Sequence, residues 1–141
     1  MPANEAMDNA AAAAAADFQR PELYLNRELS ALEFNFRVLA QARDASVPLL
    51  ERLRFLCISV RNLDEFFEVR VASLRHLLTF GDGRPGPDGV PLSVLSARVR
   101  ERATELVDAQ YETWNDELQP ALAAEGIRFG DPAAWTAAQK R

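Results

Sequence analysis

The sequence has little of what most reactive sites need. It contains one cysteine and one histidine in 141 residues, so an internal disulfide and a cysteine-rich zinc site are excluded. A chain with so little cysteine fits a reducing compartment. No stretch approaches the roughly 20 uncharged apolar residues that cross a bilayer, and acidic Glu5 and Asp8 stand where a secretory signal would be basic. We therefore expect a cytoplasmic chain with no transmembrane segment.

Positive charge is also scarce. Lys and Arg number 16 against 21 Asp and Glu, so the net charge is −5, and the isoelectric point is about 4.9. Binding along the phosphates of a nucleic acid needs a basic face, so we expect no nucleic-acid partner. Hydrophobic residues make up 48% and charged residues 26%, a balance typical of a globular domain, and the length allows one domain.

Apolar residues recur at helical spacing in three long segments. Residues 1–20 come first and are predicted to be a disordered, alanine-rich tail. The first helix follows, with an apolar face made by Leu25, Leu29, Leu32, Phe36 and Leu39. Either Asn26 caps this helix, or Ser30 and Glu33 form a capping box one turn later. The sequence leaves both open.

The second helix is predicted to begin at Pro48 and to continue for nearly thirty residues. Its face comprises Leu49, Leu53, Leu56, Val60, Leu63, Phe67, Leu74 and Leu77, with Arg70 interrupting the pattern. Phe55, Ile58, Phe66 and Val69 widen the apolar stripe. Cys57 lies among apolar neighbours and is interpreted as a small buried hydrophobe.

The third helix is predicted over Leu92–Leu118, after a connection rich in glycine and proline. Its face is marked by Leu95, Val99, Ala103, Leu106, Gln110, Trp114 and Leu118. Ile127–Phe129 then favours a short strand, and Asp131 with Pro132 favours the start of another helix. The expected fold is all-α: an up-down-up three-helix bundle with long helices and a short, incomplete C-terminal extension.

Few residues are candidates for chemistry. Asp64 and Glu68 share a helical face and could bind a metal, although such charges more often form a solvated face. His76 has no activating partner nearby and is interpreted as a surface residue. Asn62 is unusual inside a helix; it is either simply exposed or offers its amide, which donates and accepts at once, to a base or phosphate.

Three ordered blocks resemble the polyphosphate kinases of the long, histidine-phosphorylating type. They are Glu28–Leu39, Pro48–Leu56 and Ser59–Ala72, the last containing Asn-Leu-Asp-Glu-Phe. The resemblance identifies residues 21–125 as the N-terminal helical domain of such an enzyme. Residues 126–141 would then begin a truncated head domain.

The resemblance implies an ATP:polyphosphate phosphotransferase that makes polyphosphate reversibly through a phosphohistidine. Its catalytic histidines and Mg²⁺ ligands belong to C-terminal domains, so we expect no catalytic residue here and no Mg²⁺ bound by this fragment, which is expected to be inactive alone. The N-terminal domain contributes an asparagine to the ATP site, and that position is Asn62. It also takes part in family dimers, so the implied partners are ATP, polyphosphate and a second copy, in the cytoplasm or at the periphery of the inner membrane.

Two positions depart from the family pattern. Ala31 stands where tryptophan is frequent, which predicts looser local packing, and Arg61 stands where a small polar residue is common. The competing interpretation is a non-catalytic helical module for protein interaction, in which the same motif only packs helices. A third is a metal-binding bundle that uses Asp64 and Glu68.

Overall fold

A computed structural model describes residues 20–130, 135, 136 and 138. These residues are helical wherever they are regular, and none of them forms a strand, which confirms the all-α prediction. The elements in chain order are η1 (Pro21–Leu23), α2 (Arg27–Arg43), α3 (Leu49–Phe66), η2 (Phe67–Val71), α4 (Ala72–Phe80), α5 (Leu92–Glu112), η3 (Thr113–Leu118) and α6 (Gln119–Ala124). Residues 1–19 of the predicted tail, and the helix start at Asp131, lie outside the described residues.

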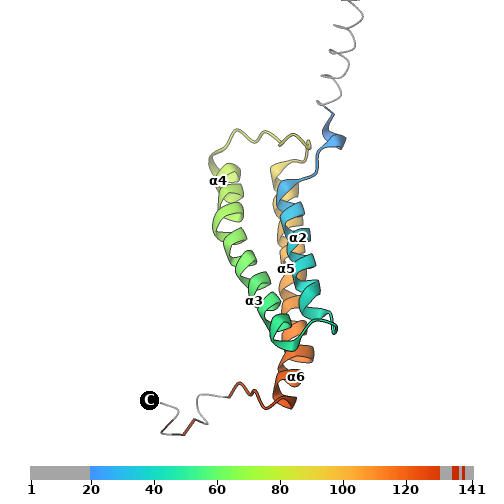
Figure 1. Cartoon of the computed structure of the whole chain (residues 1–141). Helices are drawn as coiled ribbons and strands as arrows, with labels where there is room; N and C mark the ends of the chain where they lie inside the picture. The colour runs from blue at the N-terminus through green and yellow to red at the C-terminus, as the bar shows by residue number, and fades with distance from the viewer. Residues whose placement is uncertain (1–19, 131–134, 137, 139–141) are drawn as a thin grey trace, which may run out of the picture. The chain divides into compact units, whose positions relative to one another are not determined.

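Three long helical stretches alternate in direction along the chain. The first is α2, the second joins α3, η2 and α4, and the third joins α5, η3 and α6. The short connection from Arg43 to Leu49 turns the chain back on itself, as Figure 1 shows, and the Gly/Pro-rich connection from Phe80 to Leu92 does so again. This order is the predicted up-down-up arrangement.

The helical stretches contribute to two compact units. One holds Glu65–Ala103 with the segment that ends at Glu33, and the other holds Phe34–Asp64 with the segment that begins at Thr104. Each unit has buried apolar side chains of its own. In the first these are Leu32, Phe66, Leu74, Leu95, Val99 and Ala103; in the second they are Leu39, Ala42, Leu56, Leu63, Leu106, Leu118 and Leu122.

Asn26 begins α2, which decides between the two capping predictions. Its Oδ1 accepts hydrogen bonds from the backbone N–H groups of Glu28 at 3.0 Å and Leu29 at 3.1 Å. This is the N-cap pattern that satisfies otherwise unpaired donors of the first turn. Asn26 Nδ2 also donates to Asp88 at 2.7 Å, so the same side chain fastens the Gly/Pro-rich connection to the helix start.

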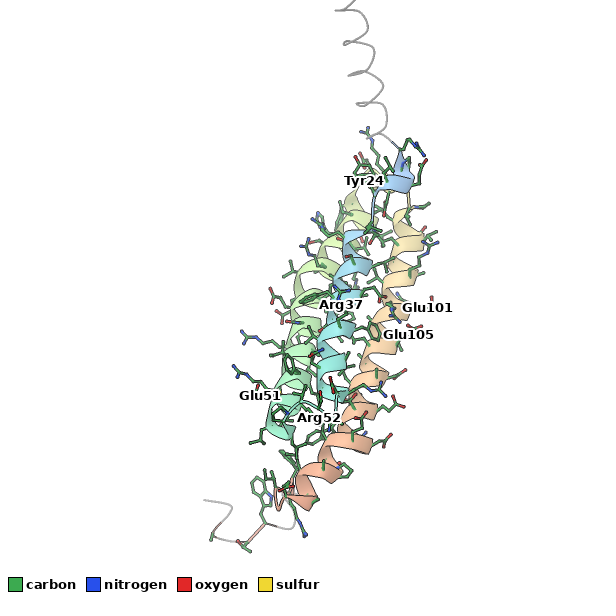
Figure 2. All side chains as sticks on the ribbon, turned by 45° about the vertical axis from the view of Figure 1, so that its right-hand side comes forward. Tyr24, Arg37, Glu51, Arg52, Glu101 and Glu105 are labelled. Atoms are coloured by element: carbon green, nitrogen blue, oxygen red, sulfur yellow. The ribbon has the colours of Figure 1, made fainter. Side chains whose placement is uncertain are left out.

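The turn between α2 and α3 is held by polar contacts. Asp44 accepts hydrogen bonds from the hydroxyl and the backbone N–H of Ser46 at 2.7 and 2.8 Å, and these lower the pKa of the Asp44 carboxyl. Arg52, labelled in Figure 2, then reaches back from α3 and donates to the backbone oxygen of Ala42 at 2.7 Å. Its other nitrogen pairs with Glu117 at 2.8 Å, which joins this turn to η3.

The predicted apolar face of the second helix is wrong at Phe67, although Leu74, which follows the interruption at Arg70, is buried as predicted. Phe66 is buried, while Phe67 is 45% exposed. In an α-helix Phe66 and Leu74, eight residues apart, would point about 80° away from each other. The π-helical turn η2 accommodates one extra residue and returns both side chains to one face. Arg70, where the sequence pattern failed, lies inside this turn.

Other side chains of that helix also differ from the prediction. Val60, Leu77 and Cys57 are exposed, so Cys57 is not a buried hydrophobe. The buried position between Leu56 and Leu63 belongs instead to Ser59. A polar residue at that place was not expected from an apolar periodicity.

The third helical stretch contains a second π-helical turn and is longer than predicted. Thr113 and Leu118 are both fully buried although they are five residues apart, a spacing that an α-helix would turn by about 140°. The π-turn η3 brings them to one face, and Thr113 rather than Trp114 takes the core position. Pro120 is tolerated in the first turn of α6, so the helix continues to Ala124.

Gly126 ends α6, and the strand predicted after it is absent. The N–H of Gly126 donates to Ala123 at 3.1 Å and that of Ile127 to Leu122 at 2.8 Å. With a φ of +84° at Gly126, these two bonds form a Schellman cap. Ile127–Phe129 therefore forms an irregular segment, and Phe129 packs edge-on against Trp114 with ring centroids 5.0 Å apart.

We expect Asn26→Ala to lower the free energy of unfolding by about 1–2 kcal/mol, because it removes the cap and the bond to Asp88. Urea denaturation followed by circular dichroism measures the loss. Ser30→Ala is the matched control and is expected to stay within about 0.5 kcal/mol of wild type. A larger loss in Ser30→Ala than in Asn26→Ala would contradict the assignment.

We expect Arg52→Ala to cost about 1–3 kcal/mol in the same assay, because a buried acceptor and a carboxylate lose their shared donor. Arg54→Ala is the control: that side chain is 72% exposed and reaches Glu51 only at 3.8 Å. Its loss is expected to stay below about 0.5 kcal/mol. Equal losses for the two arginines would show that the Arg52 contacts do not stabilise the turn.

Candidate functional site

Asn62, the residue singled out in the sequence, lies on α3 and is half-buried. Its side-chain Nδ2 donates to Oδ1 of Asn35 on α2 at 3.4 Å. The amide is therefore neither enclosed in an apolar interior nor fully free in solvent. Its nitrogen is tied to the protein, and the residue as a whole is partly exposed.

Asn35 connects Asn62 to a buried polar network. Asn35 is 4% exposed, and its Nδ2 donates to the backbone oxygen of Ser59 at 2.9 Å. Ser59 is fully buried, and its hydroxyl accepts a hydrogen bond from Nε2 of Gln110 on α5 at 2.9 Å. The network thus draws on α2, α3 and α5 within one unit. Every buried side-chain nitrogen and oxygen among the described residues has a hydrogen-bond partner.

A largely apolar groove of about 360 Å³ lies where α3 meets the end of α5. Gln110 contributes to its wall, and Trp114 and the exposed Tyr111 extend it. Asp64 is a charged residue in the lining. Trp114, expected from its spacing on the core face, is only half-buried, and Tyr111 is exposed, so neither lies in the core.

The charged residues around Asn62 project into solvent. Arg61, Asp64, Glu65 and Glu68 are all exposed. Within the described residues, no group of three or more His, Cys, Asp or Glu side chains could hold a metal ion. Asp64 and Glu68 therefore gain no third protein ligand, and this weakens the metal-binding interpretation.

The remaining residues considered from the sequence lie at the surface. His76 is exposed and packs against Phe80 with ring centroids 5.1 Å apart. Ala31 is exposed as well.

Along the described chain, no helix is both long and apolar enough to span a membrane.

Sequence reasoning missed Asn35 and Ser59 as members of the site. The available signal was a polar residue at helical spacing between apolar ones: Asn35 follows Leu32 by three residues and precedes Leu39 by four. A polar residue in such a stripe must find a hydrogen-bond partner inside the fold. Gln110 was placed on the correct face, but its contact with Ser59 could not be read from spacing.

Comparison with known proteins gives a consistent result. The chain matches the family described as the polyphosphate kinase N-terminal domain over residues 24–130. It is 59% identical over 124 residues to a polyphosphate kinase of Xylella fastidiosa (strain 9a5c), a match that covers 88% of this chain and 18% of that protein. No solved structure gives a significant match.

Other relatives bear the same name. A polyphosphate kinase of Paraburkholderia phytofirmans is 54% identical over 115 residues, covering 82% of this chain and 17% of the relative. One from Pseudomonas aeruginosa is 50% identical over 114 residues, covering 81% and 16%. The chain thus spans less than a fifth of the length of these relatives. Because the family match covers most of the chain, the chain belongs to the family of polyphosphate kinase N-terminal domains.

Proposed function

We propose that this chain is the part of an ATP:polyphosphate phosphotransferase that helps to bind ATP, and that Asn62 contacts the nucleotide. The observation that carries the proposal is that the Asn62 side chain is partly exposed and is held by a hydrogen bond to Asn35. Asn62 is an accessible amide whose inner side is held by a buried neighbour, in a domain of the polyphosphate kinase family. Its relatives bear the name polyphosphate kinase.

The physical reason is preorganisation. A binding side chain is most effective when a rigid element and a supporting layer of contacts hold it near its bound geometry. Asn62 satisfies both conditions, since it lies within α3 and its partner Asn35 is fixed by Ser59. An amide of this kind orients a base by hydrogen bonds, and little side-chain entropy is then lost on binding.

Phosphoryl transfer itself needs cationic groups and metal ions on the phosphates. No cluster of three or more metal-ligating side chains occurs among the described residues, and we propose that the Mg²⁺ expected for the whole enzyme is bound by its other parts. We assign this chain the binding and orientation of ATP, with polyphosphate and the phosphohistidine chemistry belonging to other parts of the enzyme. A second copy of the chain is the proposed dimer partner, and the cytoplasm is the proposed location.

The test is Asn62→Ala in a complete enzyme. Residues 24–130 of this chain would replace the matching domain of the Xylella fastidiosa enzyme, to which the chain is 59% identical. We expect the KM for ATP to rise about 2- to 10-fold, because one hydrogen bond to the nucleotide is lost. The KM for polyphosphate in the reverse reaction is expected to stay unchanged.

Asn115→Ala is the matched control, since Asn115 is an exposed asparagine in a helical segment of the same unit. Its KM for ATP should equal that of the unsubstituted chimera. If Asn62→Ala leaves the kinetics unchanged while the chimera is folded and active, the ATP-binding role is wrong. That outcome would favour a helical interaction module.

A further inference from the structure

An asparagine can present either its oxygen or its amino group to a ligand, and the two choices select different ligand atoms. The oxygen accepts hydrogen bonds, and the amino group carries two N–H donors. Which of them Asn62 presents is decided by the group on its inner side. That group is the side chain of Asn35.

The contacts of Asn35 leave only one arrangement. The backbone oxygen of Ser59 can only accept, so the atom of Asn35 that faces it at 2.9 Å has to be the amino nitrogen. Oδ1 of Asn35 is then the atom that faces Asn62. An oxygen without hydrogen requires a donor opposite, so Asn62 turns one N–H of its amino group inward, with its nitrogen 3.4 Å from that oxygen.

Burial keeps this arrangement from reversing. Asn35 is 4% exposed, so a flipped amide would set its oxygen against the oxygen of Ser59 with no water to relieve the repulsion. Ser59 is itself fixed, because it is fully buried and its hydroxyl is bonded to Gln110. The backbone oxygen of Ser59 thus sets the orientation of the Asn35 amide, and the Asn35 amide sets the orientation of the Asn62 amide.

We infer that Asn35 is a positioning residue: it engages one N–H of Asn62, which turns the amino group inward and leaves the carbonyl oxygen of Asn62, with the second N–H beside it, toward the ligand, so that Asn62 recognises a hydrogen-bond donor. For the ligand, this rests on the proposed ATP-binding function. The exocyclic amino group of adenine is such a donor. Adenine also has an acceptor, N1, beside that amino group for the second N–H of Asn62. Hypoxanthine has an accepting oxygen and an N–H at these two positions, so the arrangement favours ATP over ITP.

The first experiment needs no nucleotide. Side-chain amide hydrogen exchange of Asn62 is measured by NMR in the 141-residue chain, and we expect slower exchange than for an exposed asparagine such as Asn115. Asn35→Leu, which keeps the branching at Cγ but removes both hydrogen bonds, is expected to speed the exchange several-fold. Ser30→Ala is the control: Ser30 is an exposed residue of α2, the helix that carries Asn35, and its hydroxyl takes no part in the network, so exchange at Asn62 should not change.

The inference is overturned if Asn62 in the unsubstituted chain exchanges as fast as Asn115. This outcome requires no variant, so it stands even if Asn35→Leu fails to fold. It is also overturned if a folded Asn35→Leu chain leaves the exchange at Asn62 unchanged.

The second experiment compares kcat/KM for ATP and for ITP in the chimera. We expect Asn35→Leu to reduce the preference for ATP about 3- to 10-fold, because a freed Asn62 can turn its amino group toward the ligand. A merely structural role would lower both values together and leave the ratio unchanged, and that result would refute the inference.

The two proposals fail in different ways. If Asn62→Ala raises the KM for ATP but Asn35→Leu leaves the ATP/ITP ratio unchanged, the positioning role alone is wrong. If Asn62→Ala has no effect on the KM for ATP, the proposal that Asn62 binds ATP is wrong. The predicted preference for ATP over ITP is then wrong as well. The exchange measurement still decides whether Asn35 orients Asn62.

Discussion

The hydrogen bonds of buried Asn35 and Gln110 constrain the unit to which the candidate site belongs. A buried amide has to be satisfied by partners inside the protein, because water cannot reach it. Both side chains find their partner at Ser59, one at its backbone oxygen and the other at its hydroxyl. Both bonds form only if α2, α3 and α5 are each rotated about their axes so that Asn35, Ser59 and Gln110 face one another. The network therefore fixes where the half-buried Asn62 lies.

The sequence predicted that the helices exist, but it did not predict correctly which side of each helix faces the core along its whole length. Apolar spacing and the proline at position 48 placed three helical stretches correctly. Core assignments failed beside the π-helical turns, where Phe66 replaces Phe67 and Thr113 replaces Trp114. A constant angle per residue underlies every periodicity argument, and a π-turn changes that angle locally. The interruption at Arg70 was the visible trace of one such turn.

The candidate site was predictable only in part. Helix propensity singled out Asn62 but left open whether it is simply exposed or offers its amide to a ligand, and only the resemblance of its sequence block to a family favoured the ATP-binding prediction. Asn35 and Gln110 were recognisable as polar residues on apolar faces, but not their common partner. Ser59 is a small residue whose backbone oxygen accepts the hydrogen bond of Asn35. Sequence spacing carries no information about that atom. The partnership depends on how three helices face one another, which only the structure provides.

A double-mutant cycle between Asn35→Leu and Gln110→Leu tests most directly whether these residues act as one network. The two side chains do not bond to each other, so any coupling passes through Ser59. Free energies of unfolding are measured by urea denaturation for the wild type, both single variants and the double variant. The account predicts that the double variant departs from the sum of the single losses by at least about 0.5 kcal/mol. Additivity within about 0.3 kcal/mol would show two independent contacts and would contradict it.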